Sequence, residues 1–236
     1  MIATTDRIQI ERVSSQADLR TVDQLRQEIF VLEMGYCQAS MERERGVLSL
    51  AHAQGALFLA TYDGFPAGAV AVDWWRGLDV GHRDVQHLQM KAFADAFGSQ
   101  SLLTARKWHV KPEYRGTRVA LLLIRAVATM TARHEDVHFV IIDCSPEMVH
   151  AYSMLGFRRF GRAFRYTADQ ACSIPMCFVA SDLGYLRCAR SPVYGHFVKH
   201  GQKDRPDVAA FFTSLIGESA NNAGEIQAGI DELSHR

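Results

Sequence analysis

Hydrophobic and polar positions follow two patterns along the chain, one typical of strands and one typical of helices. Alternating or continuously apolar runs predict strands over residues 7–13, 56–62, 67–74, 105–110, 137–144, 157–166 and 174–180. Apolar residues at helical spacing predict helices over residues 15–34, 83–97, 119–133, 145–156, 182–191 and 208–216. Cap and turn residues support these limits: Ser14 or Ser15 begins the first helix, Pro146 begins another, and Asp63-Gly64 joins two strands as a hairpin. An α/β (α+β) protein is therefore expected.

Composition restricts the class of protein further. The chain has 236 residues, 48% of them hydrophobic and 22% charged, so it can bury a sizeable core. Its formal net charge of zero gives no support for nucleic-acid binding. No apolar run approaches about 18 residues and the N-terminus lacks a signal pattern, so we expect no integral membrane segment. Five scattered cysteines favour reduced thiols and a cytoplasmic location. A single domain over residues 1–216 and a polar tail over 217–236 are expected.

The stretch from Ala105 to Ala120 carries the clearest local chemistry. A strand, a turn containing Gly116 and an apolar helix follow one another there. The first N–H groups of a helix have no internal partner, and the helix dipole adds positive charge, so such a helix start binds anions. The basic residues around it are Lys107, Lys111, Arg115 and Arg118. The alternative is an ordinary strand–turn–helix with a solvated basic turn.

Three segments carry a resemblance to the GNAT acyltransferase superfamily. V-K-P-E-Y-R-G-T-R-V-A, residues 110–120, resembles its phosphate-binding segment, Gln/Arg-x-x-Gly-x-Gly/Ala, although Arg118 stands where the middle glycine is expected. A-Y-S-M-L-G-F, residues 151–157, resembles a second GNAT signature. L-R-Q-E-I-F-V-L-E-M-G-Y, residues 25–36, resembles the N-terminal motif of acyl-homoserine-lactone synthases and long-chain N-acyl amino acid synthases.

The resemblance implies a fold and two sets of binding residues. The fold would be a mixed, mostly antiparallel sheet, splayed at the acyl-donor site, with helices on both faces. The residues implied to bind the donor are His109, Val110, Lys111, Arg115, Gly116, Thr117, Arg118, Val119 and Ala120. Those expected to bind the acceptor or acyl chain are Arg26, Phe30, Tyr36, Trp74 and Trp75. Trp74 and Trp75 have core packing as the alternative.

The same resemblance suggests how acyl transfer would proceed. Backbone N–H groups at a bulge between Lys107 and Val110 would polarise the carbonyl, with the pantetheine arm between strands 105–110 and 137–143. Tyr152 would protonate the leaving thiolate, unless it is simply a core tyrosine. Glu33 and Asp143 are candidate bases for the amine, with His109 as a third and a water relay as an equal alternative.

Three functions remain open. The first is transfer of an acyl group from acyl carrier protein to the amine of an amino acid or similar small molecule. The second is acetylation of a small amine by acetyl-coenzyme A, and the third is a non-catalytic module that binds an acyl ligand. Arginines at 158, 159, 162 and 165 suggest docking of an acidic carrier protein, or simply a solvated strand. The histidines lack paired ligand spacing, so we expect no metal and no permanently bound cofactor.

Overall fold

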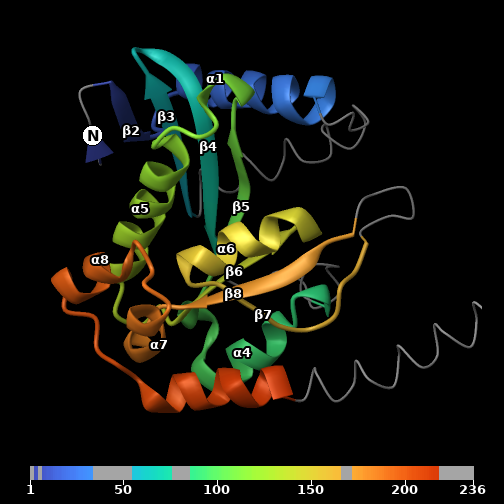
Figure 1. Ribbon diagram of the computed structural model, residues 1–236, viewed down its shortest axis with the longest axis vertical. Helices are drawn as coiled ribbons and strands as arrows, with labels where there is room; N and C mark the ends of the chain where they lie inside the picture. Colours follow the sequence, from blue (N-terminus) through green and yellow to red (C-terminus); the bar gives the residue numbers. More distant parts are fainter. Residues whose placement is uncertain (1–2, 5–6, 34–54, 76–85, 166–171, 218–236) are drawn as a thin grey trace, which may run out of the picture. The chain divides into compact units, whose positions relative to one another are not determined.

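The computed structural model describes residues 3–4, 7–33, 55–75, 86–165 and 172–217. Figure 1 shows the chain coloured along its sequence. It divides into two compact units, each made of two separate stretches. The first comprises Met1–Trp74 and Thr104–Arg133, and the second comprises Trp75–Leu103 and His134–Arg236. The expectation of one domain over residues 1–216 stays a prediction, and the tail expected over residues 217–236 lies outside the described residues from residue 218 onward.

Five strands form the sheet of the first unit. In the sheet they follow the order β1 (Ala3–Thr4), β2 (Ile8–Arg12), β3 (Gly55–Tyr62), β4 (Phe65–Trp74) and β5 (Leu102–Val110), of which β5 enters this unit at Thr104. The first three neighbouring pairs are antiparallel. Asp63 and Gly64 have φ angles of 49° and 81°, the positive values that a two-residue hairpin turn requires. The hairpin predicted from Asp-Gly is confirmed.

Helices cover both faces of this sheet. Helix α1 (Gln16–Arg26) buries Val22 and Leu25 against β3 and β4, in a cluster that includes Leu57 and Ala69. Helix α5 (Val119–Ala132) packs on the other face. Gly68 and Ala69 are neighbours on β4, so they face opposite sides of the sheet. A side chain at Gly68 would meet Leu123 of α5 at 3.3 Å, whereas Ala69 faces α1.

The first helix differs from its expected form. Ser15 accepts a hydrogen bond from the Asp18 amide, and the Asp18 carboxylate accepts one from the Ser15 amide, so the predicted serine cap is a full capping box. The α-helix ends at Arg26, and a π-helical segment, η1 (Gln27–Glu33), continues it. Apolar spacing does not reveal this change, because Leu25 and Ile29 remain in one core cluster through the wider turn.

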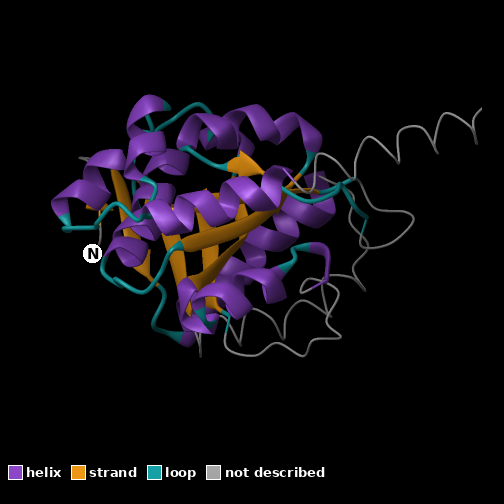
Figure 2. Cartoon of the chain, turned by 90° about the horizontal axis from the view of Figure 1, so that it is seen from below, coloured by secondary structure: helices purple, strands orange, loops and turns teal. Residues whose placement is uncertain are grey.

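Three strands belong entirely to the second unit. Strand β8 (Ile174–Val179) lies between β6 (Phe139–Cys144) and the two-residue β7 (Arg158–Arg159), antiparallel to both. Its helices are α4 (Met90–Phe97), α6 (Val149–Leu155), α7 (Leu183–Cys188), α8 (Tyr194–Lys199) and a further helix over residues 206–217. Figure 2 distinguishes these helices from the strands by colour. The α/β class and the mostly antiparallel pairing expected from the sequence are confirmed.

Aromatic side chains form the core of the second unit. The Phe93 ring of α4 meets the rings of Phe139 and Phe160 edge-on, with centroids 4.9 and 5.5 Å apart. Phe212, from the helix over residues 206–217, joins the same cluster. Trp75 is also a member, with 8% of its surface exposed.

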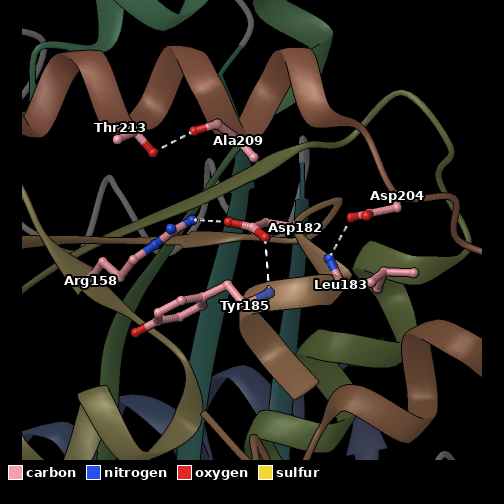
Figure 3. A network of polar contacts seen from close by, with 7 residues as sticks. All are labelled: Arg158, Asp182, Leu183, Tyr185, Asp204, Ala209 and Thr213. Carbon is pink, nitrogen blue, oxygen red and sulfur yellow. Dashed lines mark hydrogen bonds and ion pairs between the residues drawn. The ribbon is translucent and has the colours of Figure 1, made fainter. Parts of the chain in front are cut away.

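Arg158 is the centre of a partly buried polar network in this unit (Figure 3). Its guanidinium donates to Asp182 at 2.8 Å and lies over the rings of Tyr185 and Phe212. Asp182 also caps α7 by accepting from the Tyr185 amide at 3.0 Å, and the Leu183 amide donates to Asp204 at 2.9 Å. Arg158 is therefore an internal anchor, in contrast to the solvated or docking arginine that its position in the sequence suggested.

Several element limits differ from expectation. The long strand expected over residues 157–166 is reduced to β7 and a single bridge between Phe164 and Ser173. Gly161 has a φ of 60°, which interrupts extended backbone between these two pairings. Helix α8 was not predicted from the sequence. Among the described residues, no helix is long and apolar enough to cross a membrane.

Candidate functional site

The basic turn after β5 has the backbone arrangement that its sequence predicted. The strand ends at Val110, and the Lys111 amide donates to the Ala67 carbonyl of β4 at 2.9 Å. A 3₁₀ turn, η3 (Pro112–Tyr114), follows because Pro112 cannot continue the ladder. Gly116 has a φ of 80°, which a side chain would strain, and α5 begins three residues later.

The first amide of α5 has its hydrogen-bond partner within the turn itself. Thr117 Oγ1 donates to the Tyr114 carbonyl at 2.6 Å and accepts from the Val119 amide at 3.3 Å. Arg118 is the N-cap residue with a φ of −78°, so this backbone conformation does not require the glycine found there in the family pattern. The replacement of the family's glycine by Arg118 therefore causes no backbone strain at this position. It affects only how closely a ligand can approach. Ala120 is half-buried.

The basic side chains of the turn have different surroundings. Arg115 and Arg118 are exposed, and Arg115 Nε donates to the Val110 carbonyl at 3.1 Å. Lys111 Nζ lies 2.6 Å from Glu28 Oε2 of the π-helical segment, and this hydrogen bond raises the pKa of Lys111. Part of the positive charge predicted for the turn is therefore neutralised by a carboxylate that sequence proximity did not indicate.

Strand β5 is distorted where a bulge was expected. Lys107 has a φ of 53° in the middle of the strand, a value that costs a non-glycine residue on the order of 1–3 kcal/mol. His109 Nδ1 lies 2.5 Å from the Lys107 carbonyl oxygen, so the ring donates back onto the distorted residue. Strained backbone of this kind concentrates at functional sites, and here it falls in the segment expected to polarise the acyl carbonyl.

His109 lies beside two residues of the N-terminal motif. Its ring meets the Phe30 ring edge-on at 5.5 Å, and Lys107 Nζ lies 5.8 Å from the Phe30 centroid. The pKa of His109 is lowered to about 4, mainly by burial and also by the charges of Arg26 and Lys107, while the hydrogen bond to the Lys107 carbonyl opposes this shift. Arg26 is fully buried. The first unit therefore brings together Arg26, Phe30 and His109, which the sequence assigned to acceptor and donor binding separately.

Asp73 is a candidate that the sequence analysis missed. It lies near the end of β4 opposite Gly55, and burial raises its pKa to about 6, partly offset by Arg106. Carboxyl groups with such pKa values are common at functional sites. The available signal was a single acid in the apolar run A-G-A-V-A-V-D-W, which marks a charge at a position otherwise suited to burial.

Tyr152 lies in the second unit on α6. It is 8% exposed, and its ring meets Phe157 edge-on with centroids 5.6 Å apart. Burial raises the pKa of Tyr152, and the nearby Cys144 and Asp143 raise it further. Its hydroxyl is therefore protonated at neutral pH, the state that an acid for a leaving thiolate requires.

The remaining predicted residues lie in different units or outside the described residues. Asp143 is half-buried on β6 of the second unit, and Trp74 is half-buried at the end of β4 in the first. Trp75 lies in the aromatic core of the second unit, the packing role that was its alternative. Glu33 ends the π-helical segment, but its side chain lies outside the described residues, as does the whole of Tyr36.

Comparison with solved structures identifies the fold. FeeM, an N-acyl amino acid synthase from uncultured soil microbes, matches 74% of this chain and 92% of its own, with a TM-score of 0.55 and 15% identity. An acetyltransferase from Streptococcus agalactiae matches 74% and 99%, with a TM-score of 0.51 and 14% identity. A GNAT-family acetyltransferase from Staphylococcus aureus matches 73% and 98%, with a TM-score of 0.51 and 11% identity. No protein-family model and no curated protein sequence matches the chain.

These likenesses show that the protein has the fold of the GNAT acyltransferases. The resemblance seen in the three sequence segments is therefore confirmed at the level of the fold. At 11–15% identity the likeness carries no information on donor or acceptor.

Proposed function

We propose that the protein is an N-acyltransferase, which moves an acyl group from a phosphopantetheine thioester to the amine of an amino acid or similar small molecule. The observation that carries this proposal is the course of the chain from β5 to α5. A strained residue in the strand, Lys107, is followed by a basic turn and by a helix start with backbone donors. The distorted strand would polarise the thioester carbonyl, and the helix start would hold a phosphate.

We further propose long-chain acyl carrier protein as the donor. Arg118 occupies the position where GNAT enzymes carry a glycine, and a side chain there limits close approach of a pyrophosphate. A carrier protein presents phosphopantetheine with a single phosphate, which needs less room. The N-terminal motif supports the same branch, because Phe30 of this motif contacts the His109 ring and the charge of Arg26 acts on it.

A coenzyme A-dependent acetyltransferase is the second candidate. The observation in its favour is that Arg115 and Arg118 are both exposed at the basic turn, which gives a pyrophosphate more than one cation. The two candidates share the transfer chemistry and differ in the donor.

Thiol release from the purified protein tests both candidates. We would offer either a long-chain acyl carrier protein or acetyl-coenzyme A, each with a pool of amino acids, and measure the liberated thiol. Release from the long-chain donor alone is the expected result. Release from acetyl-coenzyme A alone would replace the carrier-protein proposal with the second candidate. Thermal stabilisation by a donor without any thiol release would contradict acyl transfer and favour a binding module.

A further inference from the structure

One imidazole nitrogen of His109 has a hydrogen-bond partner and the other has none among the described residues. Nδ1 lies 2.5 Å from the Lys107 carbonyl oxygen, and because a carbonyl only accepts, Nδ1 carries the hydrogen. In the neutral ring Nε2 then holds a lone pair. Nε2 is buried, and among the described residues it has no hydrogen-bond partner. The side chain is therefore oriented by its own strand so that a single unused acceptor faces the interior.

An unused buried acceptor is uncommon in a folded protein. Nearly all buried polar groups have a partner, and exceptions point to strain, catalysis or a missing ligand. The whole residue is only 6% exposed. Phe30 contacts the ring edge-on, and the charges of Arg26 and Lys107 act on it. An apolar ring against the imidazole and the positive potential of two cations suit a neutral donor group and disfavour a cation.

We propose that His109 Nε2 is a binding residue that accepts a hydrogen bond from a neutral N–H group of the substrate. This inference rests on the proposed function. Two parts of the reactants have this chemistry: an amide of the pantetheine arm, and the amine acceptor in its unprotonated form. In both cases the bond would fix the reactant beside the distorted strand at Lys107.

The surroundings of His109 favour a binding role over a role as general base. Burial lowers the pKa of His109 to about 4, whereas an alkylammonium has a pKa of about 10. Taking a proton from such an ammonium would be unfavourable by about 10⁶-fold. His109 therefore stays neutral and accepts a hydrogen bond, and removal of the amine proton is left to another group.

Two substitutions divide the roles of the two nitrogens. His109→Gln places an amide oxygen near the position of Nε2, whereas His109→Asn keeps a short amide that can reach the Lys107 carbonyl in place of Nδ1. If Nε2 binds substrate, the glutamine variant retains function and the asparagine variant loses about tenfold. If His109 only supports the strand through Nδ1, the order of the two variants is reversed.

The measurements distinguish the two sources of the N–H group. Calorimetry with coenzyme A and with 4′-phosphopantetheine, in the absence of an acceptor, measures how strongly the pantetheine arm binds. Thiol release with increasing concentrations of the amino-acid pool measures how strongly the amine binds. Weaker binding of both probes to His109→Asn assigns the bond to pantetheine. Unchanged probe binding with a raised half-saturating pool concentration assigns it to the amine.

The proposal is overturned if His109→Asn matches the wild type in both measurements, which is the result expected if a water fills the site. It is also overturned if the asparagine variant retains function and the glutamine variant does not. If His109→Asn fails to fold, His109→Met replaces it, because methionine fills the space without an equivalent acceptor. A wild-type protein that binds neither probe and releases no thiol contradicts the proposed function itself, and the inference fails with it.

Discussion

The ammonium group of Lys111 lies 2.6 Å from a carboxylate oxygen of Glu28, although 83 positions separate the two residues in the sequence. The pair joins the basic turn after β5 to the π-helical segment that follows α1. Its two side chains are 22% and 50% exposed, so we expect it to contribute less than about 1 kcal/mol to stability. Its consequence for ligand binding is larger, because Glu28 neutralises one of the cations assigned to the donor phosphate.

The first prediction concerns this pair. Glu28→Gln should tighten binding of coenzyme A and 4′-phosphopantetheine by about two- to fivefold, because it leaves the charge of Lys111 uncompensated. Lys111→Met should weaken both by a similar factor. Calorimetry at low salt measures the effects, and Lys91→Met, which removes an exposed lysine paired with Asp95 in the second unit, is the control. Opposite or absent changes would show that Lys111 does not face the donor.

The second prediction concerns the missing glycine. Arg118→Gly should improve the affinity for coenzyme A more than that for 4′-phosphopantetheine, because the pyrophosphate gains close access to the backbone. Arg118→Ala separates this effect from the loss of charge. Since the φ of Arg118 is −78°, neither substitution relieves strain, and thermal unfolding should change little. Equal responses of the two ligands would remove the argument from Arg118 for a carrier-protein donor.

The third prediction concerns Tyr152. Tyr152→Phe should lower kcat by about ten- to a hundredfold with little change in the donor KM, because the ring packing against Phe157 is kept and only the proton donor is lost. Tyr185→Phe is the matched control, since it removes a hydroxyl from the same unit and leaves the ring stacked on Arg158. Steady-state thiol release measures both. A Tyr152→Phe enzyme with wild-type kcat would leave Tyr152 as a core residue.

The fourth prediction follows from the buried carboxyl of Asp73. Its pKa is raised from 3.8 to about 6, so between these pH values the folded protein binds more protons than the unfolded chain. The free energy of unfolding therefore falls as pH rises through this interval, by up to about 3 kcal/mol. Asp73→Asn should be more stable than the wild type above pH 6 and equal to it near pH 4.

Denaturant unfolding across this pH range measures the effect. Asp63→Asn is the control with the opposite sign, because Arg7 lowers the pKa of Asp63 and the pair stabilises the protein at neutral pH. Asparagine also tolerates the left-handed backbone at that turn position. A gain for Asp73→Asn that is the same at every pH would contradict the assignment to ionisation.

Local signals account for the parts of the fold that the sequence predicted. Three examples are the Asp63-Gly64 turn, the Ser15 cap and the glycine at 116. Each depends on the conformational preferences of a few neighbouring residues, which can be recognised in the sequence. The bulge in β5 came from resemblance. Contacts between distant segments could be predicted neither from local signals nor from resemblance. Lys111 pairs with Glu28, and Arg158 pairs with Asp182 across 24 positions, because folding brings these segments together. The open nitrogen of His109 likewise depends on side-chain orientation, which spacing does not encode.

The fifth prediction concerns the arginines proposed to dock a carrier protein. Arg158 is excluded from this role by its ion pair with Asp182, while Arg159, Arg162 and Arg165 are exposed. Replacing Arg159 and Arg162 with glutamate should raise the KM for acyl carrier protein by about tenfold and leave that for acyl-coenzyme A nearly unchanged, because only the carrier protein brings a large negative surface. The KM of the wild type for the protein donor should also rise with salt.

Arg187→Glu, at another exposed arginine of the second unit, controls for a general change in charge. Arg158 itself must not be used as the probe, because removing it leaves the buried Asp182 carboxylate unpaired and costs on the order of 3–5 kcal/mol of stability. Equal changes in KM for both donors, or an equal effect of Arg187→Glu, would contradict docking at Arg159 and Arg162. A carrier protein would then have to be recognised through its phosphopantetheine alone, and the basic turn before α5 would be the place to find that recognition.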